Sequence, residues 1–361
     1  MQKMLKKILP LLLIICFAFA ACSTEKTASN AESKTNSDVS FESSSAESKN
    51  SSAESDSSKE TSKETSKETS KETSGDQSDD KPVITENNFK YVAYGDSIAF
   101  GYGLKNIADE AYPRLVYAEL KSIIDKKYNA ANYYNYAVNG DKSSDLISVI
   151  NKAPSTSHNA DVITISIGGN NVLGPTFSIL TGAVMKAGQE VIQKLPLYFS
   201  GQADAESIKK IQELFKSIED GFTDENYINQ VNLGIKQLET DIPLIIRALR
   251  KESPNAVIIF QNLYNPFKGI VMPSGTNTTF DMGALGDKYI LKINETIKNA
   301  AEANNYTVVD IYSPFKNSTE KLVNVNFGGD EAFNYDPHPN KAGHIVIAEA
   351  VTNAIKELLK K

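Results

Sequence analysis

The sequence predicts an α/β domain with a five-stranded parallel sheet over residues 89–361. Short apolar runs rich in β-branched residues alternate there with longer amphipathic stretches, which is typical of parallel strands joined by helices. The run Asp-Val-Ile-Thr-Ile-Ser-Ile is apolar enough for a central strand. The expected strands are residues 91–95, 133–138, 161–167, 256–261 and 307–311. The expected helices are residues 113–126, 144–151, 227–251, 287–303 and 341–359.

Residues 172–226 interrupt this alternation. Amphipathic helices, such as residues 183–195 and 205–218, follow one another there without a strand between them. A helical insertion that packs on the core explains the pattern. The alternative is a cap that shapes a pocket, because the segment leaves directly from a loop that we place in the active site below.

The first 22 residues have the pattern of a targeting segment. Three lysines precede an almost unbroken apolar run, residues 8–21, which is too short for a comfortable membrane span. The run ends Phe-Ala-Ala-Cys, and small residues before Cys22 resemble the lipobox of bacterial lipoproteins. We therefore expect a lipoprotein signal peptide over residues 1–22 and lipidation of Cys22, which would hold the protein on the membrane outside the cytoplasm, at the bacterial cell surface. The alternative is simple secretion.

Residues 23–88 consist mostly of Ser, Glu, Lys and Thr and include four tandem Ser-Lys-Glu-Thr units. Such a segment buries too little apolar surface to offset its chain entropy, so we expect a disordered tether. The only cysteines, Cys16 and Cys22, lie in or beside the targeting segment. No disulfide and no cysteine-based metal site is therefore expected in the folded domain.

The charge balance bears on the partners of the protein. The chain has a net charge of −7, much of which falls in the tether, and the folded part is mildly acidic. Nucleic-acid binding would need a basic surface, so we expect none. We expect a monomer.

Four short motifs lie where expected strands end or where the last helix begins. Gly-Asp-Ser, which ends in Ser97, closes the first strand, and Asn-Gly-Asp, with Gly140 at its centre, follows the second. Gly-Gly-Asn-Asn, which contains Asn170, follows the third strand. Asp-Pro-His-Pro, with Asp336 and His338, comes just before the last helix. The carboxyl ends of parallel strands face one crevice, so these groups can meet in space.

The four motifs supply what acyl transfer needs. Ser97 can be the nucleophile and His338 the base that takes its proton. The backbone N–H groups of Ser97 and Gly140 and the side-chain amide of Asn170 can bind the oxyanion of the tetrahedral intermediate. Each such donor contributes roughly 3–4 kcal/mol of transition-state stabilisation, which is a reason to build several. No metal or other cofactor is needed.

In order and position, Ser97, Gly140, Asn170 and His338 resemble the SGNH (GDSL) hydrolase family over about residues 89–361. The resemblance implies a flavodoxin-like three-layer αβα sandwich. It also implies that these residues are the nucleophile, the oxyanion glycine, the oxyanion asparagine and the base, in that order.

Two positions depart from the family pattern. Asn171 stands where the family usually has an aspartate, and Tyr335 stands where the family usually has the acid three residues before the histidine. Asp336, two residues before His338, is the best candidate to orient the imidazole. A backbone carbonyl could hold the ring instead, which would leave a Ser-His dyad.

We therefore expect a serine esterase or lipase-like hydrolase that cleaves a small-molecule, lipid or glycan ester through an acyl-enzyme on Ser97. One alternative is a polysaccharide O-acetylesterase or acetyltransferase at the cell wall, and another is a non-catalytic binding module on the same fold. A metal site built from Asp336, His338 and His344 is disfavoured, because no other ligand cluster is evident. His158 precedes the third strand and is expected at the opposite end of the sheet.

Two further features have structural explanations as well as functional ones. Asp96 is expected to support the turn before the helix by accepting backbone N–H groups, without a part in the chemistry. The loop 264–267 (Tyr-Asn-Pro-Phe) follows the fourth strand and is either a pocket wall or an ordinary loop.

Overall fold

The computed structural model describes residues 88–124, 128, 130–274, 278–326, 334 and 336–359. The expected signal peptide, the lipidation site Cys22 and all but the last residue of the expected tether lie outside the described residues.

The sheet has five parallel strands in the order β2-β1-β3-β4-β7. This confirms the predicted fold class. The strands are β1 (Asn88–Gly95), β2 (Ala130–Asn135), β3 (Val162–Ser166), β4 (Val257–Gln261) and β7 (Thr307–Val309). The chain passes from β1 to β2 on one side and then crosses to β3 on the other. The carboxyl ends of β1 and β3 therefore flank a topological switch point, where open α/β sheets bind their ligands.

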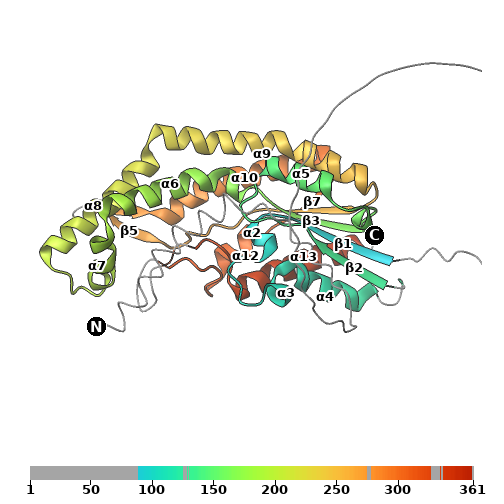
Figure 1. Ribbon diagram of the computed structural model, residues 1–361, viewed down its shortest axis with the longest axis horizontal. Coiled ribbons are helices and arrows are strands. Elements are labelled where there is room, and N and C mark those ends of the chain that lie inside the picture. The colour runs from blue at the N-terminus through green and yellow to red at the C-terminus, as the bar shows by residue number, and fades with distance from the viewer. Residues whose placement is uncertain are drawn as a thin grey trace, which may run out of the picture. The chain divides into compact units, whose positions relative to one another are not determined.

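Helices cover both faces of the sheet, which gives three layers (Figure 1). Alternate residues of β1 point to opposite faces. Val92 and Tyr94 belong to one core cluster, with α5 (Ser143–Lys152), α9 (Glu225–Glu252) and α10 (Met282–Asn299). Tyr91 and Ala93 belong to the other, with α4 (Tyr112–Ile124) and α13 (Lys341–Leu358). The remaining helices are α2 (Ser97–Phe100), α3 (Ile107–Glu110), α6 (Gly169–Ala187), α7 (Gln189–Phe199), α8 (Ala205–Thr223), α11 (Ala301–Asn304) and α12 (Tyr312–Asn317).

Between β3 and β4 the chain is helical, from α6 through α9. The expected helix 183–195 is wrong, because the chain breaks at Gly188, which has a φ of +82° and separates α6 from α7. The expected helix 205–218 extends to Thr223 as α8 and is capped by Asp204, whose side chain accepts the Ser207 N–H. Helix α9 packs against the start of α6 so closely that a Cβ at Gly234 would lie 2.0 Å from the Asn171 carbonyl oxygen.

Several boundaries differ from the sequence expectation. The expected strand 133–138 is shifted toward the N-terminus as β2, although the N–H groups of Tyr136 and Val138 still bond to Ala93 and Gly95 of β1. The expected helix 287–303 begins earlier, at Met282, and divides into α10 and α11. An antiparallel hairpin of β5 (Val271–Ser274) and β6 (Thr278–Asp281) was not predicted.

Candidate active site

Ser97 follows the end of β1 as the first residue of the short helix α2. The chain turns at Gly95, which has a φ of +156° and where a Cβ would lie 2.3 Å from the Ser166 carbonyl oxygen. Only glycine allows β1 to end this close to β3. The Asp96 carboxylate caps α2 by accepting the Ile98 N–H at 3.0 Å, as its position predicted. The turn therefore presents the Ser97 side chain at the carboxyl edge of the sheet.

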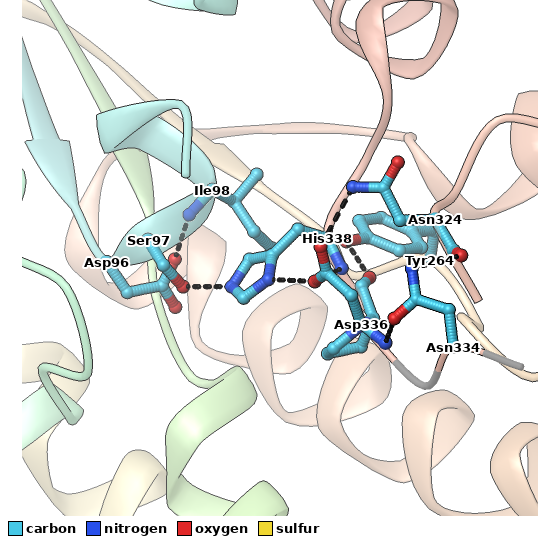
Figure 2. Close-up of polar contacts among 9 residues, drawn as sticks. Asp96, Ser97, Ile98, Tyr264, Asn324, Asn334, Asp336 and His338 are labelled. Carbon is cyan, nitrogen blue, oxygen red and sulfur yellow. Dashed lines mark hydrogen bonds and ion pairs between the residues drawn. The ribbon is translucent and has the colours of Figure 1, made fainter. Parts of the chain in front are cut away.

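The structure brings Ser97, His338 and Asp336 into one hydrogen-bonded chain (Figure 2). The His338 Nε2 atom lies 2.8 Å from the Ser97 Oγ atom. On the other side of the ring, Nδ1 bonds to the Asp336 Oδ1 atom, which also accepts the His338 backbone N–H at 3.0 Å. A nucleophile, a base and an acid that orients the base are arranged in this way in serine hydrolases. The alternative in which a backbone carbonyl replaces the acid does not match this geometry.

Residues outside the sequence motifs hold this chain in place. Asn324 donates its side-chain N–H to the Asp336 Oδ2 atom at 3.0 Å, and the Asn334 side chain accepts the Asp336 N–H at 3.1 Å. The Tyr264 hydroxyl donates to the Pro337 carbonyl at 2.8 Å. The Tyr102 ring packs on the His338 ring, with 4.6 Å between centroids. The sequence predicted none of these contacts; only Tyr264, in the loop after the fourth strand, carried a signal.

Two carboxyl groups of the site have shifted pKa values of opposite sign. Burial alone would raise the pKa of Asp336, but hydrogen bonds from His338 and Asn324 and the charge of His338 together hold it below its ordinary value. Burial raises the pKa of Asp96 to about 7, and the bond from the Ile98 N–H opposes this only in part. Asp336 is therefore ionised at neutral pH, whereas Asp96, which directly precedes Ser97, changes charge near neutrality.

The candidate oxyanion donors come from the ends of β1, β2 and β3. Asn170 is the second residue of α6, and its side-chain amide donates to the Asp141 carbonyl at 3.0 Å, which places it against the turn at Gly140. An amide nitrogen carries two hydrogens, so the second remains available. Among the described residues, the N–H groups of Ser97 and Gly140 donate to no other backbone group.

Asn171, where the family pattern has an aspartate, is buried and ties three helices together. Its side-chain oxygen accepts the Ser143 N–H at 3.1 Å, and its amide donates to the Ser143 hydroxyl at 2.8 Å and to the Gly234 carbonyl at 3.2 Å. The Ser143 hydroxyl in turn donates to buried Asp241 at 2.7 Å. A carboxylate at residue 171 would lack both donated bonds, so asparagine suits a network that already ends in one acid.

The other histidines lie apart from this chain of contacts. His158 precedes β3, and its Nδ1 atom lies 3.0 Å from Glu252. His344 is buried on α13, where Nδ1 accepts the Tyr112 N–H at 3.2 Å and burial lowers the pKa of the ring to about 4. Within the described part of the chain, no group of three or more His, Cys, Asp or Glu residues could hold a metal ion. The same residues include no helix with the length and hydropathy to cross a membrane.

An apolar pocket lies next to the candidate site. Its wall includes Ile98, which follows Ser97, and Gly169, which precedes Asn170. The loop after β4 contributes Tyr264, Pro266 and Phe267, so this loop lines a pocket. Residues that directly follow Ser97 and directly precede Asn170 therefore form part of the pocket wall.

Comparison with known proteins gives one family match. Residues 93–346 match the GDSL-like lipase/acylhydrolase family. No curated protein matches the sequence. Among solved structures, the chain is similar to a lipase from a goat rumen metagenome, with 19% identity and a TM-score of 0.45 over 74% of this chain and 97% of the other. An extracellular lipase from Streptomyces rimosus has 16% identity and a TM-score of 0.44 over 73% and 99% of the two chains. A phospholipase A1 from Streptomyces albidoflavus NA297 has 19% identity and a TM-score of 0.42 over 74% and 98%. Because the family match extends from β1 into α13 and spans well over half of the sequence, the chain belongs to the GDSL-like lipase/acylhydrolase family.

Proposed function

We propose that this protein is a serine hydrolase that cleaves carboxylic esters through an acyl-enzyme on Ser97. The observation that carries the proposal is the hydrogen-bonded chain from Asp336 through His338 to Ser97. Membership of the GDSL-like lipase/acylhydrolase family supports the same class of reaction.

The geometry supports a two-step reaction. His338 Nε2 accepts the Ser97 proton as Oγ attacks the ester carbonyl, and the carbonyl oxygen becomes an oxyanion held by the Ser97 and Gly140 N–H groups and the Asn170 amide. Asp336 stabilises the imidazolium that forms. His338 then gives the proton to the leaving alcohol. A water molecule, deprotonated by His338, attacks the acyl-enzyme, and the carboxylic acid leaves as Ser97 recovers its proton.

We also propose that the enzyme works outside the cytoplasm, on a lipid anchor at Cys22 with residues 23–88 as its tether. The support is the sequence pattern of residues 1–22 and the composition of the tether. Palmitate labelling in the producing bacterium should mark the wild-type protein, and Cys22→Ala should abolish the label. A mature N-terminus other than Cys22 would contradict the anchor and leave the proposed chemistry untouched.

Fluorophosphonate labelling tests the proposed chemistry directly. The probe should attach to Ser97 in the folded protein, and Ser97→Ala should remove both the label and the hydrolysis of p-nitrophenyl acetate. Ser178→Ala, at an exposed serine on α6, is the matched control and should keep both. Absence of label on folded wild-type protein would overturn the proposal.

A further inference from the structure

We infer that the preferred substrate is an ester of an unbranched acyl chain of medium length, and that this chain lies in the apolar pocket between α6, α9 and α10. The inference rests on the proposed ester hydrolysis at Ser97 and names the substrate class of that site.

One face of α6 forms a wall of the pocket. Gly169, Val172, Leu173 and Thr176 line it, and their spacing of three and four residues places them on the same side of the helix. Gly169 directly precedes the candidate oxyanion residue Asn170. The wall therefore begins at the reaction centre and continues along the helix into the insertion.

A face of α10 forms the opposing wall. Met282, Leu285, Gly286, Tyr289 and Ile290 line the pocket with the same helical spacing. Two facing apolar helix surfaces make a slot, and a slot suits an extended hydrocarbon chain.

The depth of the pocket sets the length of the chain. Helix α6 rises about 1.5 Å per residue, so Thr176 lies roughly 10 Å along the axis from Gly169. An extended hydrocarbon with bonds of about 1.5 Å advances about 1.25 Å per carbon, so about eight carbons cover this distance. At Thr176 the side-chain hydroxyl bonds to the Tyr227 hydroxyl at 3.2 Å, and the Tyr227 ring packs edge-on against Phe222 and Tyr289. These aromatic rings form the far end of the slot.

The polar groups of the pocket do not suit a sugar. The residues that line it in the described chain include no charged side chain. The hydroxyls of Thr176 and Tyr227 bond to each other, and Tyr264 bonds to the Pro337 carbonyl. The buried Tyr289 hydroxyl, which has no partner among the described residues, is a single donor. Sugar recognition requires several placed polar groups, whereas this lining removes apolar surface from water.

A series of p-nitrophenyl esters tests the inference. For wild-type enzyme, kcat/KM should rise about fourfold per methylene from acetyl toward octanoyl, which is the gain from burying one methylene, and level off beyond it. Concentrations stay below those at which the esters form micelles. Release of acetate from acetylated xylan is measured for comparison, because it represents a glycan substrate.

A variant inside the pocket should shorten the preferred chain. Val172 lies about 5 Å along α6 from Gly169, so the ring of Val172→Phe should block the slot after the first few carbons. We expect the acetyl ester to keep its kcat/KM within about threefold and the octanoyl ester to lose at least tenfold. Met185→Phe, on the same helix at a side chain that is 82% exposed, should leave the whole profile unchanged. If Val172→Phe proves unstable, Leu173→Phe on the same wall replaces it.

The outcomes distinguish the preference for an acyl chain from the ester hydrolysis itself. Three outcomes would overturn the inference: a wild-type kcat/KM that is flat or falls as the acyl chain lengthens from acetyl, preferred release of acetate from xylan, or an equal loss for both esters in Val172→Phe. In each case, fluorophosphonate labelling of Ser97 would still support the proposed ester hydrolysis. Absence of both labelling and ester hydrolysis would overturn the inference together with the proposed function.

Discussion

Replacing Asp336 by asparagine tests the orientation of the base, because Asp336→Asn removes the charge and keeps the shape. The Asp336 Oδ1 atom bonds to the His338 ring and backbone, whereas Oδ2 accepts the Asn324 amide at 3.0 Å. Asparagine has one oxygen and one NH2 group for these two positions. Either orientation therefore loses a contact that the carboxylate makes.

The size of the effect follows from these two orientations. If the amide oxygen faces His338, its NH2 group faces the NH2 group of Asn324, which costs about 1–3 kcal/mol for a buried donor without an acceptor. If the NH2 group faces His338, Nδ1 must accept, so the proton moves to Nε2 and the ring cannot take the Ser97 proton. Neither orientation supplies the negative charge that stabilises the imidazolium. The related exchange in a serine protease triad costs about 10⁴-fold in kcat, and we expect a loss of about 10³–10⁴-fold here.

The assay is steady-state hydrolysis of p-nitrophenyl butyrate at pH 7, with the rate of fluorophosphonate labelling as a second readout. Thermal unfolding of the same preparation shows whether the variant is folded. Asn324→Ala is the partial control: it removes one bond to Asp336 but keeps the carboxylate, so it should cost far less than Asp336→Asn. A loss below tenfold in folded Asp336→Asn would refute the reasoning and mean that another group holds His338.

Three further predictions concern neighbouring residues. Because the pKa of Asp96 is raised to about 7, its contribution to the free energy of unfolding is full below about pH 4 and is lost as pH rises through 7. In urea unfolding, the wild type should lose about 4 kcal/mol relative to Asp96→Asn across this range, and a difference in unfolding free energy that stays constant with pH would contradict this. Asn170→Ala should lower kcat about 10²–10³-fold with little change in KM, whereas a change in KM alone would exclude an oxyanion role. Asn171→Asp should destabilise the fold by about 1–3 kcal/mol at pH 8, because it removes two donated hydrogen bonds and adds a second carboxylate to the network of Asp241. The loss should be smaller at low pH, where the protonated acid regains a donor, and an unchanged urea midpoint at pH 8 would contradict the role of this network.

The sheet and the proximity of the candidate site residues could be predicted because both depend on local pattern. Buried parallel strands are short apolar runs, and the strand-end motifs fall where a parallel sheet must bring its loops together. The sequence therefore indicated that Ser97, His338 and Asp336 lie together, although the first and last motifs are far apart in the chain.

The supporting contacts could not be predicted because they depend on tertiary packing. Asn324 and Asn334 lie in a segment without periodicity, and nothing local links them to Asp336. The break at Gly188 was missed because amphipathic periodicity continues on both sides of it. Asn171 was recognised as a departure from the family pattern, but its bonds to Ser143 and Gly234 require the packing of α5 and α9 on α6.

The position of helix α6 bears on which acyl-chain lengths the proposed site would accept. Its first turn carries the candidate oxyanion donor Asn170, and its next turns carry the pocket wall at Val172 and Thr176. The length available to the acyl chain from the reacting carbonyl therefore depends on the rise of α6 between Asn170 and Thr176. Phe222 of α8 and Tyr227 of α9 close the far end of the pocket, whereas α7 contributes none of the described residues that line it, so changes in α7 should leave this length unchanged.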